Sequence, residues 1–219
     1  MMLKELILGI LFPPRCILCR AILSAPETDL CHGCRTDQPV YASKDKKIRF
    51  VKEFTALWYY EGNVRKSLIR YKFSNARHYG PVYGRLLGMR LLREELADVD
   101  LVTWVPIGPR RLRKRGYDQV EILARAVARE LELPGEKTLV KPKDNPPQSG
   151  IRSIEARKAN VLGMYRIANA DAVKDKRVLL LDDIVTTGAT VSECARVLLS
   201  AGAKEVICAA VAAGRNQKQ

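Results

Sequence analysis

The chain has 219 residues, of which 38 are Lys or Arg and 24 are Asp or Glu, so its formal net charge is +14. Hydrophobic residues make up 47% of the sequence, enough to offset the entropy cost of ordering the chain, which excludes a wholly disordered protein. With 14 Gly, 11 Pro and 6 Cys, the composition also excludes collagen-like and disulfide-dense chains. The charge has two explanations: a solvated surface rich in Lys and Arg, or a polyanionic partner such as nucleic acid, a phosphorylated metabolite or an anionic membrane.

The first twelve residues, MMLKELILGILF, are mostly apolar and end before Pro13 and Pro14. They are too short to span a bilayer, and no small-residue cleavage site of a secretory signal follows them. A docking helix and a shallow anchor at a membrane surface both fit this pattern. We therefore expect a cytoplasmic protein, with peripheral association at the inner face of the membrane as an alternative.

Four of the six cysteines form two CxxC pairs with eleven residues between them, Cys16 with Cys19 and Cys31 with Cys34. A CxxC turn brings two sulfurs to one side, and two such turns supply the four thiolates of a tetrahedral zinc site. The alternative is a pair of disulfides, but nothing indicates export to an oxidising compartment. The spacing therefore predicts a structural zinc ion, with neighbouring His32 as a bystander.

This pattern divides the chain into a segment over residues 1–45 that includes the zinc module, and a second domain over residues 46–219. Apolar residues at helical spacing predict helices over residues 64–72, 81–96, 118–131 and 189–200. Short apolar runs predict strands over residues 55–60, 101–106, 138–141, 162–167, 178–181 and 205–212. Residues 142–160 contain three prolines and predict a long mobile loop. The alternation predicts an α/β fold, a parallel sheet with helices on both faces.

Basic residues gather in two stretches. Residues 62–93 contain eight of them and no acid, and residues 110–115 (RRLRKR) contain five. A charge run is usually a solvated face, but the first stretch can also bind single-stranded DNA, with phosphate contacts from Arg65, Lys66, Arg70 and Lys72. The same stretch offers four aromatics that either stack on bases or pack in the core: Tyr71, Phe73, Tyr79 and Tyr83. The second stretch follows a predicted strand and precedes a predicted helix, where phosphate loops lie.

The most informative segment is VLLLDDIVTTGAT, residues 178–190. Asp182 and Asp183 end a buried strand, and the carboxyl end of a parallel strand is where open α/β sheets bind ligands. These carboxylates suit two ribose hydroxyls or a hydrated divalent cation. The hydroxyl-rich turn that follows opens a helix, whose N-terminus favours a phosphate. We predict a phosphate cradle formed by Thr186, Thr187, Gly188, Ala189 and Thr190; the alternative is a turn that only caps the helix.

This segment resembles the phosphoribosyl-pyrophosphate (PRPP) loop of type I phosphoribosyltransferases, and the element order over residues 55–213 is similar to theirs. The resemblance implies that Asp182 and Asp183 bind the ribose 2′ and 3′ hydroxyls, that the cradle holds the 5′-phosphate, and that Mg²⁺ accompanies PRPP. It also implies a pyrophosphate loop over residues 107–119 and a closing loop over residues 142–160. Within the pyrophosphate loop, the residues expected to act are Arg113, Arg115, Gly116 and Gln119.

The two CxxC pairs, together with YEGNVR at residues 60–65, Val105-Pro106 and RKRGYDQ at residues 113–119, resemble the ComF (ComFC/GntX) family. These are phosphoribosyltransferase-like proteins linked to natural competence. The resemblance implies a PRPP-binding protein that helps to handle or import single-stranded DNA, with other DNA-uptake proteins as partners. A catalytic phosphoribosyltransferase that joins PRPP to an acceptor and releases pyrophosphate is the alternative. Thr186 stands where the 6-oxopurine enzymes carry an acid, which argues against purine salvage.

Overall fold

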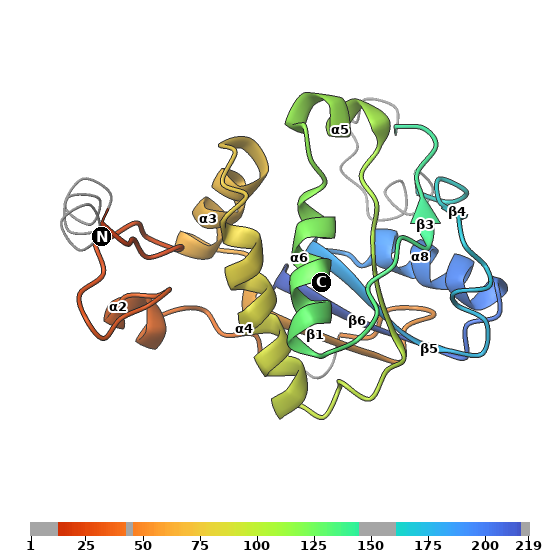
Figure 1. Cartoon of the computed structure of the whole chain (residues 1–219), viewed down its shortest axis with the longest axis horizontal. Coiled ribbons are helices and arrows are strands. Elements are labelled where there is room, and N and C mark those ends of the chain that lie inside the picture. Colours follow the sequence, from red (N-terminus) through yellow and green to blue (C-terminus); the bar gives the residue numbers. More distant parts are fainter. Residues whose placement is uncertain (1–12, 43–45, 145–160, 216–219) are drawn as a thin grey trace, which may run out of the picture.

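The computed structural model describes residues 13–42, 46–144 and 161–215. The apolar N-terminal stretch and nearly all of the expected closing loop lie outside these residues. Figure 1 shows a small module, which contains α2 (His32–Thr36), beside a larger α/β domain. Among the described residues, no helix combines the length and the apolar character needed to cross a bilayer.

A four-stranded sheet in the order β1-β6-β5-β2 forms the centre of the larger domain. All three strand pairings are parallel, as the alternation of strands and helices predicts. The central strands β5 and β6 are buried along most of their length, because both faces of a parallel sheet are covered. The bounds of the strands are β1 (Glu53–Tyr59), β2 (Leu101–Trp104), β5 (Arg177–Val185) and β6 (Glu205–Ala213).

Helices cover both faces of this sheet (Figure 1). Leu179 and Leu181 of β5 pack in one apolar cluster with α3, α4 and α6, whereas Leu180 points to the other face and packs with α8. This alternation follows from the two-residue period of a strand. The bounds are α3 (Gly62–Phe73), α4 (Tyr79–Arg93), α6 (Gln119–Glu130) and α8 (Ala189–Ser200).

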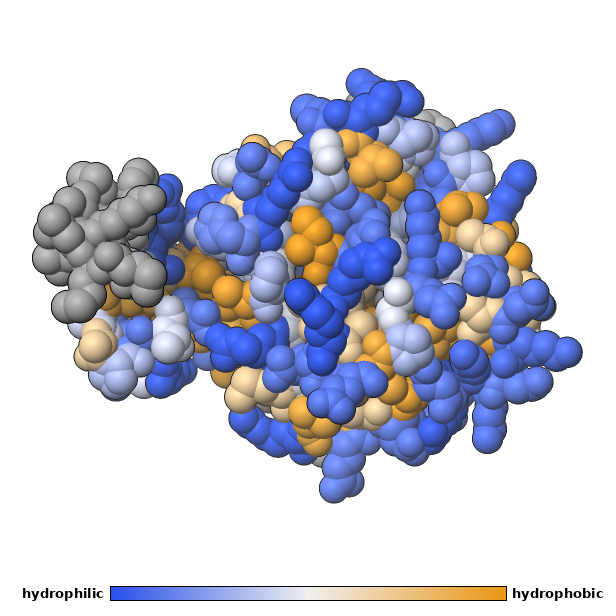
Figure 2. Space-filling view, in the orientation of Figure 1, coloured by the Kyte–Doolittle hydropathy of each residue, from blue (hydrophilic) through white to orange (hydrophobic). Residues whose placement is uncertain are grey.

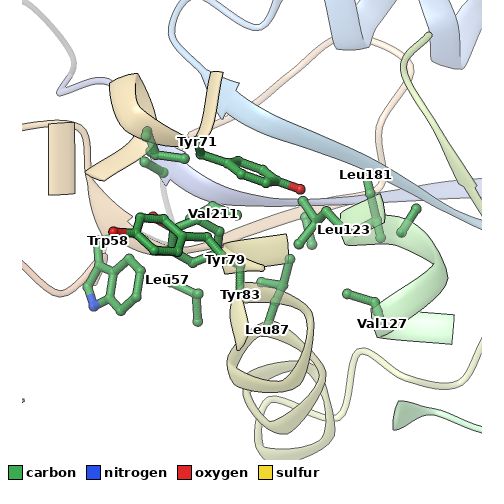
Figure 3. Packing of buried hydrophobic residues seen from close by; sticks show 14 of the residues in the cluster. Leu57, Trp58, Tyr71, Tyr79, Tyr83, Leu87, Leu123, Val127, Leu181 and Val211 are labelled. Atoms are coloured by element: carbon green, nitrogen blue, oxygen red, sulfur yellow. The ribbon is translucent and has the colours of Figure 1, made fainter. Parts of the chain in front are cut away.

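Three tyrosines from the basic stretch lie in the core between α3, α4 and the sheet (Figure 3). Tyr71 and Tyr83 are fully buried, Tyr79 is nearly so, and the Tyr71 and Tyr83 rings meet edge to face at 5.5 Å. Core packing is therefore the correct interpretation for these three. Phe73 differs, because 64% of it is exposed.

Three glycines allow α4 to lie close against α6. A Cβ added at Gly84 would overlap the Cβ of Ala126, and one added at Gly88 would lie 2.5 Å from Glu130 Cγ. Gly80 belongs to the same stripe, where a Cβ would overlap the Ile122 side chain of α6. This close approach holds the beginning of α6 near the carboxyl ends of β2 and β5.

The basic run 110–115, expected to be a loop, forms a helix instead, α5 (Pro109–Arg115). Pro109 at the first helical position has a φ angle suited to a helix, and Arg, Leu and Lys are good helix formers. Gly116 ends the helix with φ of 72°, a left-handed conformation that glycine adopts readily. Both end signals are present in the sequence, but the density of charge obscured them.

Two expected strands lie outside the parallel sheet. β3 (Leu139–Val140) and β4 (Arg166–Ile167) pair antiparallel in a separate two-stranded sheet. The strand expected over residues 162–167 is shorter because Gly163 has φ of 72° and turns the chain. β5, in contrast, continues past residue 181 to Val185, so Asp182 and Asp183 belong to the strand itself.

Candidate ligand-binding site and zinc module

The Sγ atoms of Cys16, Cys19, Cys31 and Cys34 all lie within 4.8 Å of one another. The separation between Cys19 Sγ and Cys31 Sγ is 3.5 Å, and none of the six cysteines forms a disulfide. Tetrahedral zinc with Zn–S bonds of about 2.3 Å requires sulfurs about 3.8 Å apart. The cluster therefore fits one zinc ion and not the alternative of two disulfides. His32 does not belong to the cluster, and its backbone N–H donates to Glu27.

The zinc module is fastened to α3. Arg70 donates to the carbonyl oxygens of Ile17 and Leu18 at 3.0 and 2.6 Å, and the Ser67 hydroxyl also donates to the Ile17 carbonyl. Asn63 Nδ2 lies 4.0 Å from Cys34 Sγ and donates to it. Side chains of α3 therefore supply several of the polar contacts that hold the module in place.

The four residues expected to contact DNA do not share one face. Arg65 and Lys66 are exposed, as that prediction requires. Arg70 is half-buried against the zinc module. Lys72 points into the α/β domain, where its Nζ lies 2.9 Å from Asp183 Oδ1. Two of these four basic side chains are therefore engaged in contacts within the protein and do not belong to one continuous basic surface.

A cavity of about 550 Å³ opens at the carboxyl ends of β2 and β5. Six basic side chains line it, four of them from α5, and hydrophilic side chains gather over α5 at the top of the molecule (Figure 2). Three acidic side chains also line it, so positive charge exceeds negative charge at its wall. The charged residues are Lys72, Arg110, Arg111, Lys114, Arg115, Lys141, Asp144, Asp182 and Asp183.

Asp182 and Asp183 form the acidic floor of this cavity. The exposed fraction of Asp182 is 9%, and that of Asp183 is 3%. Asp183 Oδ1 pairs with Lys72 Nζ, and Asp183 Oδ2 accepts a hydrogen bond of 2.9 Å from Gln119 Nε2. The Asp183 backbone N–H donates to Asp182 Oδ1 at 2.8 Å. Burial, together with the neighbouring Asp183 charge, raises the pKa of Asp182 above its ordinary value.

Gln119 is the first residue of α6 and is only 2% exposed. Asp118 caps this helix, accepting from the N–H groups of Val120 and Glu121, and the Tyr71 hydroxyl donates to the Gln119 carbonyl at 2.6 Å. Gln119 lines the cavity, and its side-chain Oε1 has no hydrogen-bond partner among the described residues. The resemblance assigns Gln119 to pyrophosphate, but the contact that the structure gives it is with the acidic pair.

Four of the five basic residues of α5 line the cavity, and the fifth does not. Arg110, Arg111, Lys114 and Arg115 line the cavity, whereas Arg113 is exposed and is not part of its wall. Arg115 also lies 5.0 Å from the centre of the Phe73 ring, a cation–π contact at the end of α3. Of the two arginines expected to meet pyrophosphate, the structure places Arg115 at the cavity.

The expected phosphate cradle follows β5 and leads into α8. Gly188 has φ of 79° and precedes the first residue of α8, and a Cβ there would lie 3.0 Å from Ile48. Thr186 and Thr187 are exposed, and Thr190 lines the cavity together with Tyr165. The cradle therefore borders the cavity at the beginning of α8. Nothing local in the sequence marks Tyr165 as part of this wall.

Residues 121–219 match the family model of the phosphoribosyl transferase domain, and residues 7–44 match that of the double zinc ribbon domain. The chain is 25% identical over 215 residues to competence protein F of Haemophilus influenzae, covering 88% of this chain and 93% of that protein. It is 31% identical over 152 residues to competence protein ComFC of Streptococcus pneumoniae, covering 69% and 64%. It is 30% identical over 139 residues to DNA utilization protein YhgH of Escherichia coli, covering 62% and 60%. The chain belongs to the ComF family.

In this ComF-family chain, the cavity wall is completed by residues that precede the matched phosphoribosyl transferase segment. Lys72 comes from α3, three arginines and one lysine come from α5, and Gln119 begins α6. The segment matched to the transferase model begins only at residue 121. The acidic pair belongs to the matched segment, and its contacts reach outside it. Tertiary packing therefore joins two parts of the chain into one site.

Proposed function

We propose that this ComF-family protein binds PRPP with Mg²⁺ in the cavity and helps to handle single-stranded DNA during natural transformation. The observation that carries the proposal is the buried acidic pair at the end of β5, which lines the same 550 Å³ cavity as the basic residues of α5. The names of the Haemophilus, Streptococcus and Escherichia relatives support the role in competence and DNA utilization.

The chemistry of PRPP suits this wall. Its pyrophosphate is matched by the guanidinium groups of α5, which bind phosphate oxygens in a bidentate manner. The 5′-phosphate is matched by the beginning of α8, where backbone N–H groups and the helix dipole favour an anion. Carboxylate oxygens are the protein ligands that Mg²⁺ prefers, so Asp182 or Asp183 would hold the ion, which would neutralise pyrophosphate charge when bound.

Isothermal titration calorimetry with PRPP and Mg²⁺ tests the binding site. We expect the double variant Asp182→Asn with Asp183→Asn to abolish the binding heat, because it removes both carboxylates from the cavity floor. The matched control is Asp171→Asn, an exposed acid that does not line the cavity. A folded double variant that binds PRPP as the wild type does would contradict the proposal.

For DNA, we propose that the exposed cations Arg65 and Lys66 contact phosphates and that Phe73 stacks on a base. Phe73 is the exposed aromatic of the basic stretch, and Arg115 lies against its ring. The logarithm of the affinity for labelled oligothymidylate should fall with the logarithm of salt concentration, with a slope of about −0.7 per phosphate contacted.

Arg65→Glu with Lys66→Glu should flatten this slope. Phe73→Ala should weaken DNA binding but leave the slope unchanged. The matched control is Lys174→Glu with Lys204→Glu, which makes the same charge change at two exposed lysines outside the basic stretch. If the control flattens the slope as much as the Arg65 and Lys66 variant does, DNA binding does not use the surface of α3.

A catalytic phosphoribosyltransferase is the second candidate function. The raised pKa of Asp182 favours it, because a buried carboxyl with such a pKa can give or take a proton closer to neutral pH than an ordinary aspartate. Incubation with PRPP and a panel of nucleobases and amines, scored for pyrophosphate release, tests it. Release that depends on a defined acceptor would establish an enzyme, and no release with any acceptor would support a binding protein.

A further inference from the structure

We propose that a second cavity, between the zinc module and α3, binds a phosphate group of single-stranded DNA. Its residues come from both parts of the chain: Arg15 and Arg20 belong to the zinc module, and Arg70 and Ser74 to the end of α3. Figure 1 shows the module beside this helix. This cavity has no lining residue in common with the one at the carboxyl ends of β2 and β5. The inference rests on the proposed DNA handling and gives the zinc module a direct contact with the polynucleotide.

The wall of the second cavity is positively charged. The cavity has a volume of about 410 Å³ and is lined by Arg15, Arg20 and Arg70, whereas no acidic side chain of the described residues lines it. None of the three arginines forms an ion pair with a carboxylate in the part of the chain that the structure describes. Guanidinium groups match phosphate oxygens in a bidentate geometry. The uncompensated charge therefore fits a phosphate group.

Arg70 has a structural role that leaves one of its donors unused. Its Nη2 donates to the carbonyl oxygens of Ile17 and Leu18, which fixes the guanidinium group against the zinc module. Its guanidinium carbon lies 5.9 Å from the centre of the Tyr79 ring. Arg70 Nε is buried and has no hydrogen-bond partner among the described residues, and such a donor is rare in a folded protein. A phosphate oxygen in the cavity would supply the missing acceptor.

The zinc cluster positions the other two arginines. Arg15 precedes Cys16 and Arg20 follows Cys19, so both flank the first CxxC turn. The Arg20 backbone N–H donates to the Cys16 carbonyl at 2.9 Å, and Arg15 Nη1 donates to the Arg20 carbonyl at 3.1 Å. Both arginines are exposed. The turn that carries two of the zinc ligands therefore also holds two cations at the cavity.

The position of the cavity on α3 favours a polynucleotide over a free phosphate. Lys66 comes one helical turn before Arg70, so these two residues are neighbours on the helix surface. Phe73, which is 64% exposed, directly precedes Ser74. A strand with one phosphate per nucleotide can contact Lys66, stack a base on Phe73 and place another phosphate in the cavity. An anionic lipid headgroup offers the same phosphate chemistry but no base.

Fluorescence anisotropy of the full zinc-loaded chain with labelled oligothymidylate tests the site. We expect Arg15→Gln with Arg20→Gln to weaken binding about 10-fold at low salt, the lower end of the range for hydrogen bonds to a charged group. The salt slope should become shallower by about 0.7, the value for one phosphate contact. The matched control is Arg35→Gln with Arg129→Gln, which removes two exposed arginines outside the cavity, one of them in the zinc module. The control should keep the slope of the wild type.

Zinc content shows whether the module is intact in each variant. If Arg15→Gln with Arg20→Gln loses zinc, Arg20→Gln alone decides the matter, because the exposed Arg20 side chain has no hydrogen-bond or ion-pair partner among the described residues. Equal effects of the cavity variant and the control on the slope would overturn the inference. Vesicles that contain phosphatidylglycerol are the second probe. A cavity variant that loses vesicle binding but binds oligothymidylate as the wild type does would make this a lipid phosphate site and overturn the inference.

The two proposals on DNA fail in different ways. A wild-type protein that does not bind oligothymidylate would refute the proposed DNA handling and this inference with it. If Arg65→Glu with Lys66→Glu flattens the salt slope while the cavity variants keep the slope and affinity of the wild type, DNA handling stands and this inference alone is refuted.

Discussion

The contact between α4 and α6 gives the most direct test of how the fold positions the site. Gly84 faces α6 where there is no room for a side chain: an added Cβ would overlap Ala126 Cβ and lie 3.1 Å from both Ala126 C and Val127 N. Gly84→Ala must therefore push the two helices apart. Since α6 begins at Gln119, the same displacement would disturb the floor of the cavity.

Two opposing effects set the loss in the free energy of unfolding of Gly84→Ala, overpacking and helix propensity. Overpacking a close contact costs about 1–3 kcal/mol, and the upper end applies here because the obstructing atoms belong to the backbone and Cβ of α6, which cannot rotate away. Alanine has a better helix propensity than glycine by about 1 kcal/mol. The net loss in the free energy of unfolding is then about 2 kcal/mol. For a chain of this size, about 2–4 °C per kcal/mol converts this to a fall in Tm of about 4–8 °C.

Thermal unfolding followed by circular dichroism, with zinc present, measures the change. Gly33→Ala is the matched control, because Gly33 is also helical and a Cβ there meets no atom within 4 Å. The control should keep the Tm of the wild type or raise it slightly. If Gly84→Ala melts at or above the temperature of the wild type, α4 and α6 do not pack as closely as described, and the reasoning fails.

Three further predictions concern the two sites. The raised pKa of Asp182 means that the folded state holds this proton more tightly than the unfolded state, so stability should fall as pH rises from about 4, the ordinary value, toward the raised pKa. Asp182→Asn should flatten this dependence in urea unfolding at several pH values, and an unchanged slope would contradict it. Arg70→Met should speed zinc transfer to a chromophoric chelator, because it removes the hydrogen bonds that fasten the module, whereas Arg65→Met should not. Metal analysis should find about one zinc per wild-type chain, much less in Cys34→Ala, and an unchanged amount in Cys194→Ala, a buried thiol outside the cluster.

The features that could be predicted from the sequence are those that depend on residues close to one another along the chain. The spacing of the CxxC pairs limits where four sulfurs can meet, and the structure places all four within 4.8 Å. The alternation of apolar strands with helices predicts the parallel sheet because each period is local. Asp182 and Asp183 were found because two carboxylates after four aliphatic residues are unusual wherever the rest of the chain lies.

The basic residues show where such reasoning ends. In the sequence, Arg65 and Lys72 belong to one stretch without acids, yet one is exposed and the other is paired with Asp183. Charge in a one-dimensional pattern carries no information about which side chain turns inward. The pairing of Lys72 with Asp183 depends on α3 lying against α6, and hence on the tyrosine and glycine packing between helices.

The sequence by itself thus determined the zinc ligands, the order of elements and the acidic pair, because short-range spacing and periodicity specify these features. Only the tertiary structure decided what surrounds the acidic pair. Asp183 acquires its two partners from α3 and α6, and the cavity acquires its positive wall from α5, through contacts between segments far apart in the chain. The +14 charge is divided by the same packing between the zinc module, the cavity and the open surface. Burial and close packing, which are collective properties of the folded chain, make that division.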